Sequence, residues 1–233
     1  MHFTTRSRID QFWQRTFGAT SQQDGEVRVV AHGEHLAGYP GIYAVLRQGA
    51  VLITAPSEMT AHVRAWPLSP NTVMSPDWWT ERLPGWKVLG PSVHSFAGSH
   101  EQLQAAGSAY PASPAQVRAA LASRVSPDEW AESGFAGDDV GHAWLLDDAQ
   151  NRPVAAANLT PFDGVAADVG VLVAREARGR GHAVAAASAA VRYAVGHHGI
   201  ARWRALETNS ASLAVAARLG FDEDCRQLAA RPV

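Results

Sequence analysis

The strongest constraint on the fold comes from residues 171–191, which read VLVAREARGRGHAVAAASAAV. A short apolar run, typical of a buried strand, ends in a cluster of arginines that contains Gly179 and Gly181. A long alanine-rich stretch without a helix-breaking residue follows. The pattern predicts a strand, a tight loop and a helix that begins near Gly181. This unit places the chain in the α/β class.

The loop between the predicted strand and helix has the composition of an anion-binding site. A helix start exposes backbone N–H groups that have no acceptor within the helix, and the helix dipole adds partial positive charge. Gly179 and Gly181 let the backbone approach an anion closely. Arg178 and Arg180 can add charge-assisted hydrogen bonds, and Ala183 keeps the next position small. We therefore predict that a pyrophosphate group binds across the start of this helix.

Three loop patterns that bind phosphate can be compared with this sequence. A Walker loop requires Gly-Lys-Ser/Thr, which is absent, and a dinucleotide fingerprint would need a glycine at Val184. The third pattern, Arg-x-x-Gly-x-Ala, is met by Arg178, Gly181 and Ala183. It resembles the pyrophosphate loop of the GNAT superfamily of acetyl-CoA-dependent N-acetyltransferases.

A second stretch, ETNSASLAVAARLGF at 207–221, supports the same resemblance. Asn209 opens a predicted helix, Ser212 follows three residues later, and Leu-Gly-Phe ends the helix, with Gly220 as its C-cap. This is similar to the second acetyl-CoA motif of GNAT proteins. The resemblance covers about residues 113–233. It implies a GNAT-like mixed, largely antiparallel sheet with a splayed central strand pair, flanked by helices.

The resemblance also implies a cosubstrate site and a reaction. The pantetheine arm lies in the gap between the strand that ends at Val173 and the strand at 201–207, and a backbone N–H there polarises the thioester carbonyl. The acceptor amine attacks directly, without an enzyme nucleophile. The implied acetyl-CoA contacts are Val171, Leu172, Val173, Arg178, Gly179, Arg180, Gly181, His182, Ala183, Asn209 and Ser212.

The general base is less well specified than the acetyl-CoA site. Glu207 ends the strand beside the gap, and Asp168 lies in the strand that leads to Val173, so either carboxylate could take the ammonium proton. Glu207 could instead complement a helix dipole, and Asp168 could face solvent. Many family members carry a proton-donating tyrosine four residues before the helix-ending glycine, where this chain has Ala216. Another group or water then protonates the leaving thiolate, or this protein catalyses the reaction poorly.

Other residue types with possible chemistry have simpler interpretations. We expect His182 to contact phosphate or solvent, and His197-His198 to complement the dipole at a helix end. His142 is a weaker candidate for a base. Trp78-Trp79 is expected to pack in a core or loop, and Cys225 is expected on a late strand without a covalent role.

The remaining pattern predicts two parts of the chain. In the first part we expect a hairpin over 42–55 around Gln48-Gly49, a helix over 56–66, and short strands at 86–89 and 93–96. Residues 67–85 hold four prolines and many polar residues, and glycine and serine interrupt 97–108. In the second part we expect helices that begin with capping boxes at Ser113 and Ser126, strands at 142–146, 153–159, 165–173 and 201–207, helices at 181–197 and 210–219, and one or two final strands. The predicted domains are therefore an N-terminal α/β domain over 1–110, either a degenerate half of the same fold or a lid for the acceptor pocket, and a GNAT acetyltransferase domain over 111–233.

Composition limits the classes of function. The 233 residues carry a net charge of −2 and one cysteine, which disfavours a global attraction to nucleic acid and excludes a disulfide framework within one chain. The N-terminus lacks the apolar run of a signal peptide, and no segment approaches the roughly 20 apolar residues of a membrane span. We expect a cytoplasmic monomer or homodimer that uses acetyl-CoA and an amine acceptor, without a metal and without a nucleic-acid or membrane partner. A catalytically weak CoA-binding regulatory module is the alternative.

Overall fold

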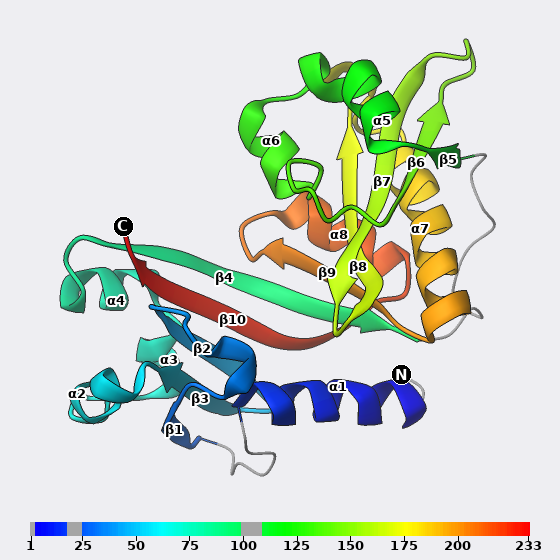
Figure 1. The fold of residues 1–233 in the computed structure, drawn as a ribbon. Coiled ribbons are helices and arrows are strands. Elements are labelled where there is room, and N and C mark those ends of the chain that lie inside the picture. The colour runs from blue at the N-terminus through cyan, green and yellow to red at the C-terminus, as the bar shows by residue number, and fades with distance from the viewer. Residues whose placement is uncertain (1–2, 18–24, 99–108) are drawn as a thin grey trace. The chain divides into compact units, whose positions relative to one another are not determined.

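The computed structural model describes residues 3–17, 25–98 and 109–233 (Figure 1). Contacts divide the chain into a first unit, which comprises Met1–Thr5, Ser95–Arg204 and Ala211–Asp222, and a second unit, which comprises Arg6–His94, Ala205–Ser210 and Glu223–Val233. Most of the stretch at 97–108 that glycine and serine interrupt lies outside the described residues. The predicted domain boundary between residues 110 and 111 stays a prediction. No helix of the described residues is long and apolar enough to span a membrane.

The sheet of the first unit has the strand order β9-β8-β7-β6-β5. β5, β6, β7 and β8 pair antiparallel with their neighbours, whereas β8 and β9 pair in parallel. The predicted mixed, largely antiparallel sheet is therefore confirmed. The strands are β5 (Tyr110–Ala112), β6 (His142–Asp147), β7 (Pro153–Phe162), β8 (Val165–Val173) and β9 (Ala201–Leu206).

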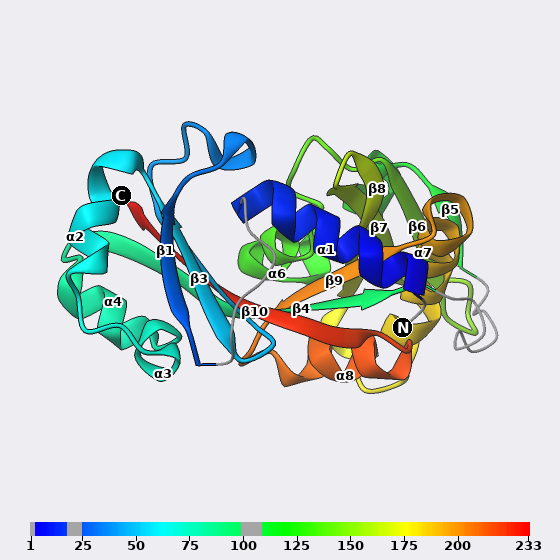
Figure 2. The same ribbon diagram turned by 90° about the horizontal axis from the view of Figure 1, so that it is seen from below.

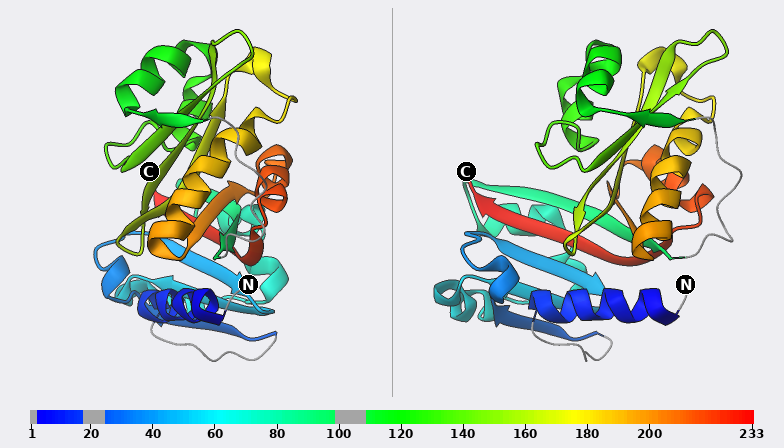
Figure 3. Two further views of the ribbon diagram at one scale, coloured as in Figure 1. Left: turned by 90° about the vertical axis from the view of Figure 1, so that its right-hand side faces the viewer. Right: turned by 45° about the vertical axis from the view of Figure 1, so that its right-hand side comes forward.

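Helices cover both faces of this sheet. α7 (His182–His198) packs against β6, β7 and β8 on one face, and α5 (Pro114–Leu121) and α6 (Pro127–Glu132) lie on the other, as the two views of Figure 3 show. Short 3-10 turns, η3 (Ala122–Arg124) and η4 (Arg175–Ala177), follow α5 and precede α7. The buried face of α7 is mostly alanine, which lets the helix approach the sheet closely.

The helix ends of the first unit follow the sequence signals. Ser113 and Ser126 each accept a hydrogen bond from the backbone N–H three residues later, and the side chain at that third position closes a capping box. α8 (Ser210–Arg218) ends at Gly220, whose φ is +77°. The N–H of Phe221 donates to the carbonyl of Ala216 at 3.1 Å, which is the hydrogen bond of a Schellman end. The predicted capping boxes and the C-cap at Gly220 are confirmed.

The strands of the second unit follow the order β1-β3-β2-β10-β4. The predicted hairpin is confirmed, and its turn places Gln48 and Gly49 at φ +52° and +79°, as a two-residue hairpin turn requires. The predicted final strand is one long strand, β10. The strands are β1 (Val27–Ala31), β2 (Ile42–Arg47), β3 (Ala50–Ala55), β4 (Trp86–Ala97) and β10 (Asp222–Pro232).

Helices also lie on both sides of the strands of the second unit. In Figure 2, α2 (Thr60–Arg64), α3 (Pro70–Val73) and α4 (Pro76–Arg82) lie on one side of β1 and β3, and α1 (Phe3–Phe17) lies on the other. Two 3-10 turns, η1 (Glu34–Leu36) and η2 (Ser57–Met59), complete the set of described elements. The Trp79 indole is fully buried and donates to the Val73 carbonyl at 2.7 Å, so the interpretation of Trp78-Trp79 as core packing is confirmed.

Several expectations for this unit were wrong or incomplete. The proline-rich stretch at 67–85, for which no element was predicted, contains α3 and α4, because Ser69 forms a capping box ahead of Pro70, and Ser75-Pro76 starts the next helix. The two short strands predicted at 86–89 and 93–96 are one strand, β4. At Gly90 a Cβ atom would lie 2.6 Å from the carbonyl oxygen of Gln227, so the glycine keeps β4 within the sheet where a larger residue would break it.

Candidate functional site

β8 and β9 form a fork in the sheet of the first unit. Their register contains only two pairs, Asp168 with Arg202 and Val169 with Trp203. β8 then continues to Val173, still paired with β7, where Val173 lies opposite Ala155. The end of β8 therefore has a hydrogen-bonded neighbour on one side only. This confirms the predicted splayed central strand pair.

The alternation of an antiparallel ladder decides which peptide groups face the open side of β8. The N–H of Ala174 donates to the Val154 carbonyl at 2.9 Å, so Leu172, two residues earlier, also directs its peptide groups toward β7. Val171 and Val173 direct theirs to the side that β9 leaves. Leu172 also buries its side chain in the core. Of the three valine and leucine positions predicted to contact acetyl-CoA, Val171 and Val173 have peptide groups in the required direction.

Asp168 lies at the base of the fork and is ion-paired. A β-bulge between β7 and β8 places an extra residue, Ala167, just before it. Both Asp168 oxygens accept hydrogen bonds from Arg202, with Nε–Oδ1 at 2.9 Å and Nη2–Oδ2 at 2.6 Å. Asp168 is 8% exposed, so the alternative that it faces solvent is wrong. The pair joins β8 to β9 immediately before the strands separate.

The glycine loop that follows η4 is open to solvent. Gly179 and Gly181 have φ values of +74° and +83°, a region that L residues rarely adopt. A Cβ atom at either glycine would meet nothing within 4 Å, and Arg180 between them is exposed. The glycines are therefore required by backbone conformation rather than by crowding.

The start of α7 meets the requirements of an anion site. Gly181 is the N-cap and has no side chain to bond to the first turn, which also lacks acidic residues. The N–H groups of His182, Ala183 and Val184 have no acceptor within the helix, and all three residues are half-buried. Unused N–H groups, the helix dipole and open surroundings therefore coincide at this helix start, which are the features that bind an anion.

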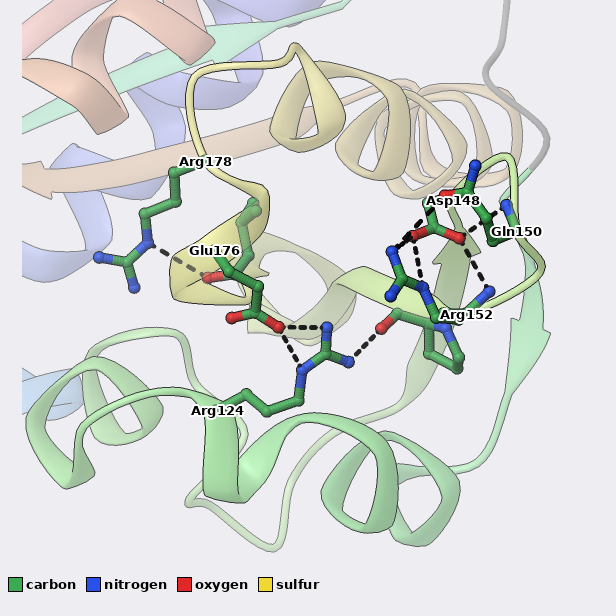
Figure 4. A network of polar contacts seen from close by, with 8 residues as sticks. Arg124, Asp148, Gln150, Arg152, Glu176 and Arg178 are labelled. Atoms are coloured by element: carbon green, nitrogen blue, oxygen red, sulfur yellow. Dashed lines mark hydrogen bonds and ion pairs between the residues drawn. The ribbon is translucent and has the colours of Figure 1, made fainter.

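Two ion pairs fix the loop that precedes α7. Arg124 of η3 bonds Glu176 of η4, with Nε–Oε1 at 2.8 Å, and also donates to the Pro153 carbonyl (Figure 4). Arg178 donates through Nε to the Val173 carbonyl at 3.3 Å, and its Nη2 lies 2.8 Å from Glu129 Oε1. These contacts hold η4 and Arg178 while leaving the two glycines exposed.

Glu129 is the more strongly perturbed of the acidic partners. The backbone N–H of Ser126 is the main cause that lowers its pKa from 4.5 to about 2, and the Arg178 guanidinium adds to the shift. The pKa of Glu176 is also lowered, by a backbone hydrogen bond and by Arg124. Both carboxylates are therefore charged at neutral pH, which keeps both ion pairs formed.

The turn between β6 and β7 carries a third ion pair in Figure 4. Asp148 accepts hydrogen bonds from the backbone N–H groups of Gln150 and Arg152 and from the Arg152 guanidinium, with Nη2–Oδ2 at 2.7 Å. The Arg152 side chain is the main cause that lowers the pKa of Asp148 to about 2. This pair closes a surface turn, and it lies outside the predicted site.

The second predicted motif surrounds the start of α8. The N–H of Asn209 donates to the Leu206 carbonyl at 2.9 Å just before the helix. The hydroxyl oxygen of Ser212 accepts a hydrogen bond from Trp203 Nε1 at 3.0 Å, and Trp203 is almost fully buried. Their contacts with acetyl-CoA stay predictions.

The two candidate bases have different surroundings. Glu207 belongs to the second unit, is exposed, and pairs with Arg226 at 2.9 Å. Its own N–H donates to the Pro91 carbonyl at 2.9 Å. Asp168 belongs to the first unit and is buried. Sequence reasoning missed the arginine partners of both carboxylates because each arginine is distant in sequence from the carboxylate that it pairs with.

The remaining predicted positions have clear placements. Ala216 is buried in the last turn of α8 and has no hydroxyl to donate a proton. Cys225 is buried on β10, a late strand as expected. His197 and His198 lie in the last turn of α7, where His197 Nδ1 lies 2.9 Å from the Tyr193 carbonyl oxygen. The His142 ring lies beside the Tyr193 ring in a tilted arrangement, with ring centroids 4.2 Å apart.

The first unit is therefore an α/β domain that combines a fork between parallel strands with a glycine loop at the start of the following helix. A family model described as acetyltransferase (GNAT) domain matches residues 90–222, more than half of the chain. The chain therefore belongs to the GNAT acetyltransferase family, whose general chemistry is acyl transfer.

Several solved structures are similar to the chain at low sequence identity. The chain is 17% identical to a GNAT-family acetyltransferase from Colwellia psychrerythraea, with a TM-score of 0.49 over 63% of this chain and 57% of that one. It is 17% identical to a putative GNAT-family acetyltransferase from Novosphingobium aromaticivorans, with a TM-score of 0.46 and coverages of 64% and 69%. A GCN5-related N-acetyltransferase from Kribbella flavida is also 17% identical, with a TM-score of 0.43 and coverages of 65% and 62%. The match thus spans little more than half of the Colwellia protein. No curated protein matches the sequence.

Proposed function

We propose that the protein is an N-acetyltransferase that moves an acetyl group from acetyl-CoA to a primary amine by direct attack. The observation that carries the proposal is the open glycine loop at the start of α7, in the same unit as the fork between β8 and β9. The loop supplies unused N–H groups for phosphate, and the fork supplies peptide groups for the pantetheine arm.

Each part of the proposed site has a separate task. The N–H groups from Gly179 to Ala183 and the Arg180 side chain bind the pyrophosphate. Val171 and Val173 offer backbone groups to pantetheine, and a backbone N–H there stabilises the charge that develops on the thioester oxygen. Acetyl-CoA supplies the activated acetyl group. The proposed contacts at Arg178, His182, Asn209 and Ser212 complete the site, whereas Leu172 is proposed only as the core residue between Val171 and Val173.

For the general base we propose Glu207, with Asp168 as the competing candidate. Glu207 is exposed, so its carboxylate can reach an amine or a water molecule, although it also forms an ion pair with Arg226. Asp168 uses both oxygens on Arg202 and is buried. The ion pair with Arg202 gives Asp168 a structural role at the fork. This favours Glu207 over Asp168 as the general base.

A specific observation supports one alternative, a CoA-binding regulatory module with weak catalysis. Ala216 stands where many family members have a proton-donating tyrosine, and it is 3% exposed. Without that tyrosine, water or another group must protonate the leaving thiolate.

The test is turnover of acetyl-CoA with a panel of primary amines, followed as release of free thiol. Release that depends on the amine supports the N-acetyltransferase. CoA binding without amine-dependent release from any member supports the regulatory module, and absence of both contradicts the proposed site.

We also propose that the protein acts in the cytoplasm as a monomer or homodimer, without a metal ion. The N-terminal part over residues 1–110 is proposed either as a degenerate half of the same fold or as a cover for the acceptor pocket. The lone buried cysteine, Cys225, is compatible with a reducing compartment.

A further inference from the structure

The Glu129 carboxylate has two functions in the structure. Oε2 accepts a hydrogen bond from the Ser126 N–H at 2.7 Å, which closes the capping box of α6. Oε1 lies 2.8 Å from Nη2 of Arg178, the first residue of the pyrophosphate motif, and Arg175 Nε lies 3.6 Å from Oε2. One side chain therefore joins a helix start on one face of the sheet to the loop that precedes α7.

The chain contains an internal comparison that separates these two functions. The capping box of α5 has the same geometry with a neutral residue, since Gln116 Oε1 accepts from the Ser113 N–H at 2.8 Å. Both glutamine and glutamate serve at this position of a capping box. The cap of α6 therefore does not need a negative charge at Glu129, whereas the pair with Arg178 does.

Arg178 is held at two points on its guanidinium. Its Nε donates to the Val173 carbonyl, and its Nη2 reaches Glu129. Figure 4 shows the side chain folded back from the loop toward the end of β8. Arg178 directly precedes Gly179, so fixing its side chain restricts the backbone that enters the glycine loop.

We infer that Glu129 is a positioning residue for acetyl-CoA: it fixes Arg178, and through Arg178 it holds the Gly179–Gly181 backbone ready for pyrophosphate. The inference rests on the proposed function of this loop. Preorganisation improves affinity because the loop and the side chain are already ordered before CoA binds, so binding does not carry the entropy cost of ordering them. Arg178 then acts mainly through its position rather than as a direct phosphate contact.

The sign of one effect separates positioning from simple electrostatics. A negative charge near an anionic ligand weakens binding, so on charge alone Glu129→Gln would strengthen CoA binding. Positioning predicts the opposite. We expect Glu129→Gln to weaken CoA binding about fivefold, the fold-change expected from one long side chain that must be ordered on binding.

Asp128→Asn is the matched control. Asp128 lies in the same first turn of α6 and is exposed, and its substitution removes the same charge from the same helix end. We expect unchanged or slightly tighter CoA binding, measured by isothermal titration. In turnover with acetyl-CoA, Glu129→Gln should raise KM and leave kcat unchanged. Unfolding by urea should show that both variants stay folded.

A double-mutant cycle tests whether the two residues act as a unit. We expect Arg178→Gln and the double variant with Glu129→Gln to bind CoA equally weakly, because the second change removes nothing further. Additive losses would show that Arg178 contacts phosphate independently of Glu129. Unchanged or tighter binding by Glu129→Gln would overturn the inference, as would failure of the wild type to bind CoA, which would also remove the proposed function.

A measurement without ligand distinguishes failure of the inference about Glu129 from failure of the proposed function. The Arg178 Nε–H group should give a protected signal in a ¹H–¹⁵N spectrum of the free protein, because it donates to Val173. The signal should be lost in Glu129→Gln and kept in Asp128→Asn. A signal that persists in Glu129→Gln would show that Glu129 does not hold Arg178.

Discussion

Substitution of Gly181 by glutamate tests the proposed anion site with effects on stability and binding that can be separated. The φ value of +83° strains any L residue, at about 1–2 kcal/mol of unfolding free energy. A Cβ atom there meets nothing within 4 Å, so no steric term adds to the strain. A carboxylate at a helix N-terminus interacts favourably with the dipole by roughly 0.3–1 kcal/mol. The expected net loss of stability is therefore about 1 kcal/mol, and the protein should remain folded.

The effect on ligand binding should be much larger. Two unit charges 4 Å apart repel by about 4 kcal/mol at an effective dielectric constant near 20, before screening by salt. We therefore expect Gly181→Glu to weaken CoA binding at least about a hundredfold, which corresponds to roughly 2.7 kcal/mol. Isothermal titration and circular dichroism would measure binding and folding on the same sample.

Two variants separate charge from strain. Gly199, at the other end of α7, has φ +69° and equally open surroundings, so Gly199→Glu introduces similar strain and the same charge far from the predicted phosphate. Gly181→Gln keeps the strain and removes the charge. We expect near-normal CoA binding by Gly199→Glu and intermediate binding by Gly181→Gln. Wild-type binding by Gly181→Glu would refute the assignment of this helix start to pyrophosphate.

Three further predictions concern binding, catalysis and pH. CoA and acetyl-CoA should raise the melting temperature, with about 2.7 kcal/mol of added stability at a hundredfold excess over Kd, and NADH should not; equal shifts by all three would contradict a specific site. Glu207→Gln should lower kcat/KM at least about tenfold with unchanged CoA affinity, whereas a loss in Asp168→Asn alone would move the base to Asp168. Because the folded-state pKa of Glu129 is lowered from 4.5 to about 2, its contribution to stability is complete above pH 4.5 and is lost as the pH falls toward 2. The difference in urea stability between wild type and Glu129→Gln should therefore shrink over that interval, and a constant difference would count against the ion pair.

Local sequence signals predicted most of the elements that form the proposed site. The turn at Gln48-Gly49, the capping boxes at Ser113 and Ser126, and the C-cap at Gly220 each depend on residues close in sequence. The apolar run before Arg178 and the alanine-rich run after Gly181 gave β8 and α7 to within one residue. These features were predictable because their energetics are local.

Contacts between distant residues were not predictable in this way. The pair between Asp168 and Arg202 depends on the β8–β9 register, and a β-bulge decides which face Asp168 occupies. Glu129 was visible only as the third residue of a helix cap. β4 was divided in two because Gly90 is a strand breaker by local preference, although a close approach to β10 requires glycine at that point.

The burial of Ala216 limits whether a tyrosine can be accommodated at that position. The residue is 3% exposed, and its carbonyl accepts the Phe221 N–H that ends α8. A phenol ring would need space that the packed helix end lacks, and overpacking of this kind typically costs about 1–3 kcal/mol. A single substitution would therefore damage the helix end before it could supply a proton donor, and neighbouring side chains would have to shrink first. A tyrosine at this position therefore requires coordinated changes in the residues packed around it.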